Sequence, residues 1–210
     1  MTEQTPILKA LNIRKSFGRN RVLKGIDLEL FPGKIYGIVG ENGTGKTTLL
    51  HILAGFWKQD EGTINISCSM GFCPQSPFLF SNLTVNENLK LFELAYGLNC
   101  ETGDEKKSEY RESLIRTFKL QDYSRCQCSK LSEGTRQKLN LVVSLLHDPD
   151  LLLLDEPWSS FDWDTYLRFR DFSESLIQRG KTILIIAHFI YDKSKLDTIW
   201  ELKNGLLTCN

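Results

Sequence analysis

Hydrophobic and polar residues follow two different patterns in the predicted strands of this 210-residue chain. Residues 34–39, 151–154 and 182–187 are almost continuously apolar, which is typical of strands buried on both faces of a parallel sheet. Residues 22–31 instead alternate apolar and polar side chains, which predicts a strand with only one buried face. Stretches of helical periodicity separate these runs, so the pattern predicts an α/β fold with a mainly parallel sheet.

Turn signals place further strands near both ends of the chain. Residues 7–17 and 22–31 are predicted to be two strands joined by a turn at residues 18–20. Residues 63–66 and 70–73 are predicted to be short strands. Residues 198–207 are expected to form a hairpin around Asn204-Gly205.

The helical stretches carry recognisable start and stop signals. Thr84 and Glu87 fit a capping box, while Ser132 and Asp162 are candidate caps for two later helices. The expected helices cover 47–55, 85–96, 110–120, 133–148 and 163–179. Residues 101–109 are highly charged and contain Gly103, so we expect an exposed loop there.

The first expected helix follows a glycine-rich loop that fits the pattern G-x-x-x-x-G-K-[ST]. Its glycines let backbone N–H groups point at phosphate oxygens, a lysine reaches the terminal phosphates, and the last hydroxyl holds Mg²⁺. The preceding strand and the following helix N-terminus supply the context that anion binding requires. The loop alone indicates a phosphorylated ligand, ATP or GTP. The candidate residues that bind it are Gly40, Glu41, Asn42, Gly43, Thr44, Gly45, Lys46, Thr47 and Thr48.

Two apolar runs end in residues that could act on a nucleotide. Asp155 and Glu156 follow residues 151–154 and are expected at the carboxyl edge of the sheet, where ligands bind in open α/β folds. Asp155 would hold Mg²⁺ through its water shell, and Glu156 would accept a proton from the attacking water or orient it. Glu156 could alternatively be a helix cap or a surface carboxylate. His188 ends the run 182–187, and its position at a strand end favours the site over a purely structural role.

Composition narrows the classes of partner. Lys plus Arg equals Asp plus Glu at 26 each, so the chain has no basic field and no nucleic-acid partner is expected. No apolar run approaches the roughly 20 residues that span a bilayer, and the N-terminus has no secretion signal. These features predict a cytosolic protein. The six cysteines fit no zinc spacing and are expected to be thiols.

At this point the residues resemble one family, the ATP-binding-cassette (ABC) ATPases, from about Ile7 to Leu207. Residues 40–47 match its phosphate loop, residues 131–135 its signature motif, and residues 151–156 its second nucleotide motif. Single residues match in the same order along the chain. They are Phe17 for the adenine-stacking aromatic, Gln75 for the glutamine loop, Asp162 for the loop that contacts the dimer partner, and His188 for the switch histidine. From local sequence alone, Phe17 fits adenine stacking and edge packing equally well.

The resemblance implies a P-loop NTPase (RecA-like) core with a mainly parallel sheet, an N-terminal antiparallel β subdomain and an inserted helical subdomain. Residues 1–210 would form one nucleotide-binding domain, with the core and β subdomain at 1–75 and 135–210 and the helical part at about 76–134.

The same resemblance implies ATP and Mg²⁺ as cofactors. Two domains, as a homodimer or heterodimer, would close head-to-tail over ATP, with Ser132, Gly134 and Asp162 reaching the partner's nucleotide. The implied catalytic residues are Glu156, His188, Gln75 and Lys46, and the implied Mg²⁺ residues are Thr47, Gln75 and Asp155.

The chain departs from the family pattern in three places. In the signature motif, Glu133 stands where glycine is common and Thr135 where glutamine is common. The segment between Ile66 and Gly71 is shorter than usual, and Ala187 stands where Thr or Ser is common. A carboxylate at 133 that points at a γ-phosphate would repel it, whereas one that points away would leave the site intact. No catalytic group is lost, so an active ATPase is predicted.

The resemblance extends to a role in transport. Residues 83–98 are similar to those of bacterial exporter ATPases, and no regulatory domain is expected after Leu207. Transmembrane permease subunits would be a separate polypeptide, with this chain peripheral on the cytoplasmic face of the membrane. The alternatives are a soluble ABC ATPase, for example in cofactor assembly, and a nucleotide-gated interaction protein with low turnover.

Overall fold

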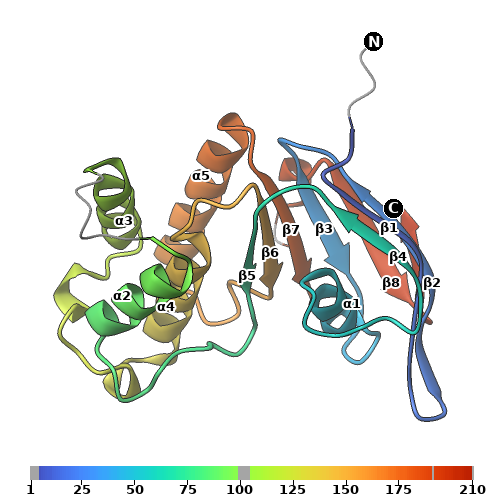
Figure 1. Ribbon diagram of the computed structural model, residues 1–210, viewed down its shortest axis with the longest axis horizontal. Coiled ribbons are helices and arrows are strands. Elements are labelled where there is room, and N and C mark those ends of the chain that lie inside the picture. The colour runs from blue at the N-terminus through green and yellow to red at the C-terminus, as the bar shows by residue number, and fades with distance from the viewer. Residues whose placement is uncertain (1–4, 99–104, 191, 210) are drawn as a thin grey trace. The chain divides into compact units, whose positions relative to one another are not determined.

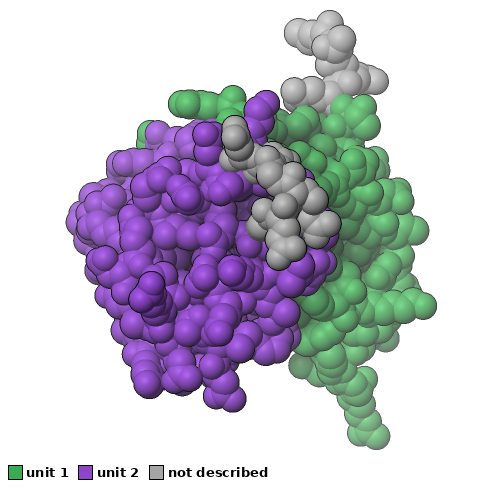
Figure 2. Space-filling view, turned by 60° about the vertical axis from the view of Figure 1, so that its left-hand side comes forward, with its two compact units in different colours: residues 1–72, 150–156, 176–210 green, residues 73–149, 157–175 purple. Residues whose placement is uncertain are grey.

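The computed structural model describes residues 5–98, 105–190 and 192–209. The chain divides into two compact units, which Figure 2 shows in different colours. Unit 1 comprises residues 1–72, 150–156 and 176–210, and unit 2 comprises residues 73–149 and 157–175. The predicted boundaries of the helical subdomain, at about 76 and 134, fall inside unit 2 and stay a prediction.

Two sheets lie side by side in unit 1 (Figure 1). The smaller is antiparallel and consists of β1 (Leu8–Phe17), β2 (Asn20–Leu30) and β4 (Glu61–Ile66), in the order β2-β1-β4. On β2, residues 26, 28 and 30 are buried, whereas the residues between them are more exposed, as the alternation predicted. The N-terminal antiparallel sheet expected from the sequence is therefore confirmed.

The larger sheet has six strands in the order β5-β6-β7-β3-β8-β9. Strand β3 is parallel to β7 and β8, β6 is parallel to β7, and β8 and β9 form the antiparallel hairpin expected around Asn204-Gly205. The bounds are β3 Ile35–Val39, β5 Met70–Cys73, β6 Leu151–Asp155, β7 Thr182–Ala187, β8 Thr198–Lys203 and β9 Leu206–Cys209. The mainly parallel α/β core is confirmed.

Burial explains why the apolar runs become the central strands. Every residue of β6 and β7 is buried, and helix α1 (Lys46–Leu53) packs against both strands. A strand that is covered on both faces needs apolar side chains at every position, which is the composition of these runs. The core of unit 1 therefore holds β6 and β7 in place from their first to their last residue.

Unit 2 is helical, and its caps form as the sequence predicts. Thr84 and Glu87 make both hydrogen bonds of the capping box, and the Ser132 side chain accepts from the Thr135 N–H. The helices are α2 Val85–Ala95, α3 Glu105–Thr117, α4 Glu133–Leu145 and α5 Trp163–Gln178, whose last three residues are assigned to unit 1. Short 3₁₀ helices cover Gln121–Tyr123 and Cys128–Lys130 here, and Lys193–Lys195 in unit 1.

The predicted loop at residues 101–109 is wrong for its last five positions. Helix α3 begins at Glu105, five residues before the predicted start, whereas residues 99–104 lie outside the described part of the chain. Lys and Glu are strong helix formers, and residues 106–109 are exposed, so their charges belong to the solvated face of a helix. A run of charges thus marked an exposed surface rather than a loop.

Candidate nucleotide-binding site

The carboxyl ends of three neighbouring strands in unit 1 bring most of the predicted catalytic residues to one edge of the sheet. Val39 on β3 is opposite Ala187 on β7, and Asp155 on β6 is opposite Ile186 on β7. The phosphate loop follows Val39 and His188 follows Ala187. Because these two residues are paired, the loop and the histidine begin at the same level of the sheet. Glu156 is fixed beside them because its N–H donates to the Ile186 carbonyl at 2.8 Å.

Glycines shape the loop between β3 and α1. Gly43 and Gly45 have φ values of +79° and +104°, a region that side-chain-bearing residues rarely adopt. At Gly40 a Cβ atom would lie 2.5 Å from the Leu202 carbonyl oxygen, so no larger residue fits without moving β8. The loop conformation thus depends on the two glycines of the pattern, Gly40 and Gly45, and also on Gly43 between them.

Lys46 closes the loop from inside. Its Nζ donates to the carbonyl oxygens of Gly40 at 2.7 Å and of Glu41 at 2.9 Å, and only 7% of the residue is exposed. The pKa of Lys46 is lowered, because the effect of burial exceeds the opposing effect of the nearby Glu156 and Asp155 carboxylates. The loop therefore surrounds a cation, as a site for phosphate requires.

Asp155 is the most deeply buried carboxylate of the site. It is 1% exposed, and its Oδ2 has no hydrogen-bond partner. Burial is the largest influence and raises the pKa of Asp155, whereas a hydrogen bond with the Thr47 side chain lowers it. A buried oxygen atom without a partner needs an external one.

A magnesium ion fits this arrangement. Mg²⁺ prefers hard oxygen ligands, keeps several waters, and is usually bound by one or two protein groups together with phosphates. The Thr47 hydroxyl and the Asp155 carboxylate provide such oxygens beside the loop. Within the described ranges, no group of three or more His, Cys, Asp or Glu residues could hold a metal ion.

Glu156 and His188 differ from Asp155 in exposure. Glu156 is partly buried and has a φ of +46°, which is uncommon for a residue with a side chain and is concentrated at functional sites. His188 is exposed just beyond β7. Both side chains are therefore accessible to a ligand at the sheet edge.

Phe17, the predicted adenine-stacking residue, is packed at its edge and still 48% exposed. Trp57 meets its ring edge-to-face at 5.7 Å, and Lys15 Nζ lies 5.6 Å from the ring centroid. His51 stacks on Trp57 at 4.7 Å and places Nδ1 2.8 Å from the Thr47 carbonyl oxygen. Trp57 and His51 were not predicted as site residues, although an aromatic residue just after the phosphate-loop helix was a usable signal.

The remaining predicted site residues lie in unit 2. Gln75 is exposed in the loop after β5, and Ser132 and Gly134 are at the N-terminus of α4. A Cβ atom at Gly134 would lie 2.6 Å from the Ser160 carbonyl oxygen, so packing inside this unit already requires a glycine there.

Glu133, the unusual residue of the signature motif, is held by its own chain. Its Oε1 accepts a hydrogen bond from the Ser160 hydroxyl at 3.2 Å. The carboxylate is therefore directed toward the loop that precedes α5. The direction of the Glu133 carboxylate could not be predicted from the sequence, and neither could its contact with Ser160.

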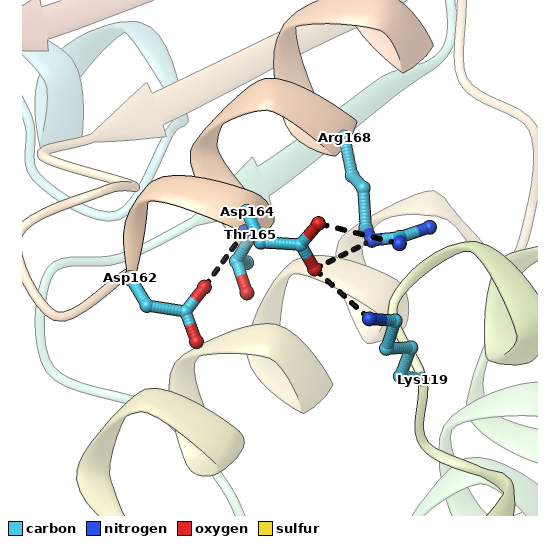
Figure 3. A network of polar contacts seen from close by, with 5 residues as sticks. All are labelled: Lys119, Asp162, Asp164, Thr165 and Arg168. Carbon is cyan, nitrogen blue, oxygen red and sulfur yellow. Dashed lines mark hydrogen bonds and ion pairs between the residues drawn. The ribbon is translucent and has the colours of Figure 1, made fainter.

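Asp162 caps α5, as predicted. Its Oδ1 accepts from the Thr165 N–H at 2.7 Å (Figure 3). A hydrogen bond with the Thr165 side chain is the main reason that the pKa of Asp162 is lowered, and the bond with the Thr165 N–H lowers it further. The neighbouring Asp164 accepts from Arg168 at 3.0 Å and Lys119 at 2.9 Å, which lowers the pKa of Asp164 to about 2. These contacts fix the start of α5 within unit 2.

A family model described as ABC transporter matches residues 23–159, which include the phosphate loop, the signature motif and Asp155. The chain belongs to the ABC transporter family. It is an ABC ATPase nucleotide-binding subunit, and members of this family hydrolyse ATP.

Two relatives from different organisms illustrate the match to ABC proteins. The uncharacterized ABC transporter ATP-binding protein MJ1023 of Methanocaldococcus jannaschii is 34% identical over 95% of this chain and 75% of its own length. The Nod factor export ATP-binding protein I of Cupriavidus metallidurans is 32% identical over 91% of this chain. The chain spans about two thirds of the length of this second relative, at 66%.

Solved ABC structures share the fold. The ATP-binding subunit of an ABC transporter superposes with a TM-score of 0.89 at 22% identity, covering 97% of this chain and 89% of that one. A dimeric bacterial ABC transporter cassette gives 0.86 at 23% identity, covering 95% and 96%. In the described residues of this ABC chain, no helix is both long and apolar enough to cross a membrane.

Proposed function

We propose that this chain binds Mg·ATP at residues 40–47 and hydrolyses it to power transport through separate transmembrane subunits. The observation that carries the proposal is the pair of buried opposite charges beside the phosphate loop. Lys46 is 7% exposed and Asp155 1% exposed, at an edge where glycines open the backbone. Burial of charged groups costs free energy, so two such groups at this edge favour a functional role over a purely structural one.

Each predicted residue of the site has a proposed task. Lys46 and the loop amides neutralise the β- and γ-phosphates. Thr48, in the first turn of α1, contributes to ATP binding. Thr47, Asp155 and Gln75 hold Mg²⁺, which when bound offsets phosphate charge. Glu156 accepts a proton from the attacking water or orients it, and His188 contacts the γ-phosphate. Phe17, which is 48% exposed, stacks on adenine.

A second nucleotide-binding domain completes the site in this proposal. Ser132 and Gly134 open α4, so their N–H groups and the helix dipole favour an anion supplied by a partner. The partner is a second copy or a different chain. A solved cassette of the same fold is described as dimeric, which supports this arrangement.

Export is the proposed direction of transport. Several relatives of this chain are Nod factor export ATP-binding proteins, and their names support the exporter similarity of residues 83–98. The chain would then act on the cytoplasmic face of the membrane, bound to permease subunits.

The contact between Glu133 and Ser160 weakens the alternative of a low-turnover interaction protein, because that alternative depended on a carboxylate pointing at the nucleotide.

Purification from membranes tests the proposal. A tagged chain, expressed in its own organism, should be recovered with a multi-span membrane protein after solubilisation in mild detergent. A tagged Lys46→Ala variant is a suitable control, because weakened nucleotide binding should leave docking to a membrane subunit possible. Recovery of the chain only in the soluble fraction, with no membrane subunit, would contradict the transport role and favour a soluble ABC ATPase.

A further inference from the structure

A buried asparagine of α4 holds the loop that carries Gln75. The Asn140 Nδ2 donates to the Pro74 carbonyl oxygen at 2.9 Å and to the Cys73 Sγ at 3.3 Å. Its Oδ1 accepts from the Phe78 N–H at 3.3 Å. One amide therefore bonds the backbone on both sides of Gln75, and its two donors and its acceptor oxygen are satisfied.

The position of this amide is unusual for its surroundings. Asn140 is 3% exposed, and its neighbours Leu139 and Leu141 are fully buried. A buried amide costs free energy unless its hydrogen bonds are made, so an apolar residue would serve better if packing were the only requirement. The loop backbone is what this side chain bonds.

Helix α4 also carries the signature motif. Asn140 lies seven residues after Glu133, roughly 10 Å along the helix axis. A continuous helix is rigid over two turns, so a displacement of Ser132 and Gly134 would be passed to residues 74–78 through this amide. Both segments belong to unit 2, and the contacts between them are direct.

A second buried asparagine provides an internal comparison. Asn88 on α2 is fully buried, and it bonds the Phe80 N–H and the carbonyl oxygens of Phe80 and Thr84. It also donates to a cysteine, Cys128, at 3.2 Å. Asn88 thus has the same chemistry and burial as Asn140 but holds the far end of the loop, away from Gln75.

We propose that Asn140 is a positioning residue for Gln75, tying the glutamine loop to the signature helix so that the two segments move together. This inference rests on the roles proposed above for Gln75 and for the signature motif. It predicts that loss of the amide impairs the site through Gln75, not through general loss of stability.

The test compares Asn140→Ser with Asn88→Ser, which remove the same amide from two equally buried positions. Amide hydrogen exchange in the nucleotide-free chain should accelerate at residues 75–78 in Asn140→Ser and at residues 80–84 in Asn88→Ser. In a Glu156→Gln background, the Mg²⁺ concentration needed for half-maximal thermal stabilisation by ATP should rise about tenfold for Asn140→Ser and stay near the unsubstituted value for Asn88→Ser.

A double-mutant cycle separates positioning from stability. In a Gln75→Ala background, Asn140→Ser should cause no further loss of turnover, whereas Asn88→Ser should add its own effect. Equal Mg²⁺ dependence for the two asparagine variants, or additive losses for Asn140→Ser with Gln75→Ala, would overturn the inference. If Gln75→Ala itself keeps full turnover and Mg²⁺ dependence, the role proposed for Gln75 fails, and the inference fails with it.

Discussion

Lys46 and Asp155 are charged groups from which water is almost excluded, and each is placed there by local backbone geometry. The loop carbonyls of Gly40 and Glu41 bond the lysine, while the second oxygen of Asp155 lacks a protein partner. Two buried charged groups that leave a carboxylate oxygen unsatisfied stabilise a fold poorly. At the scale of single residues, these two groups fit the proposed binding of Mg·ATP, which would bring both phosphate and a cation.

Ser160 gives a prediction at this scale. Ser160→Ala removes the hydroxyl that holds Glu133, so the carboxylate can turn toward the partner's nucleotide and repel it. We expect the ATP concentration for half-maximal hydrolysis to rise about fivefold, equivalent to about 1 kcal/mol. Steady-state turnover measured against ATP concentration provides the comparison.

The matched control for Ser160 is the double variant Ser160→Ala with Glu133→Gln. A neutral amide at 133 cannot repel phosphate, so the double variant should return close to the unsubstituted value. If Ser160→Ala has the same effect with and without the charge at 133, then the hydroxyl acts on the loop backbone and not on Glu133.

At the scale of elements, the strands were predictable and the contacts between distant segments were not. Burial on both faces selects continuous apolar runs, and glycine and cap residues act within a few positions, so β6, β7, the phosphate loop and the Ser132 cap could be found from local sequence. Asn140 bonds residues 62 and 66 positions away. No local pattern encodes such a pairing. The charged stretch 105–109 was wrongly predicted to be a loop, because such a composition fits an exposed loop and the solvated face of a helix equally well.

The helical unit offers a second prediction. Arg111 on α3 pairs with Glu93 on α2 at 2.9 Å, and the Glu93 side chain is only 5% exposed. Arg111→Met would leave a buried carboxylate without its cation, so we expect a loss of about 3 kcal/mol in the free energy of unfolding. Urea denaturation followed by circular dichroism measures this.

Arg116→Met is the control on the same helix. Arg116 pairs with Glu112 at 3.4 Å, and both side chains are about 60% exposed, at 62% and 59%. An exposed pair of this kind contributes about 0.5 kcal/mol or less. Similar losses for the two variants would show that the Arg111 pair does not stabilise the unit through burial.

At the scale of the whole molecule, the residues proposed to act on ATP are divided between two units. The phosphate loop, Asp155, Glu156 and His188 belong to unit 1, whereas Gln75, Ser132, Gly134 and Asp162 belong to unit 2. Motif spacing could identify both sets because each motif is short and local. In the proposed function, one chain therefore carries a hydrolytic half-site in unit 1 and a phosphate-contacting surface in unit 2.

The central claim is that this chain hydrolyses ATP with Glu156 acting on the attacking water. The most direct measurement is ATP turnover by the unsubstituted protein and by Glu156→Gln, alongside Mg·ATP binding to each by calorimetry. The account predicts similar affinities and a turnover at least about 100-fold lower in the variant, because an amide can replace the carboxylate in shape but cannot accept the proton. Comparable turnover in the two proteins would contradict the account.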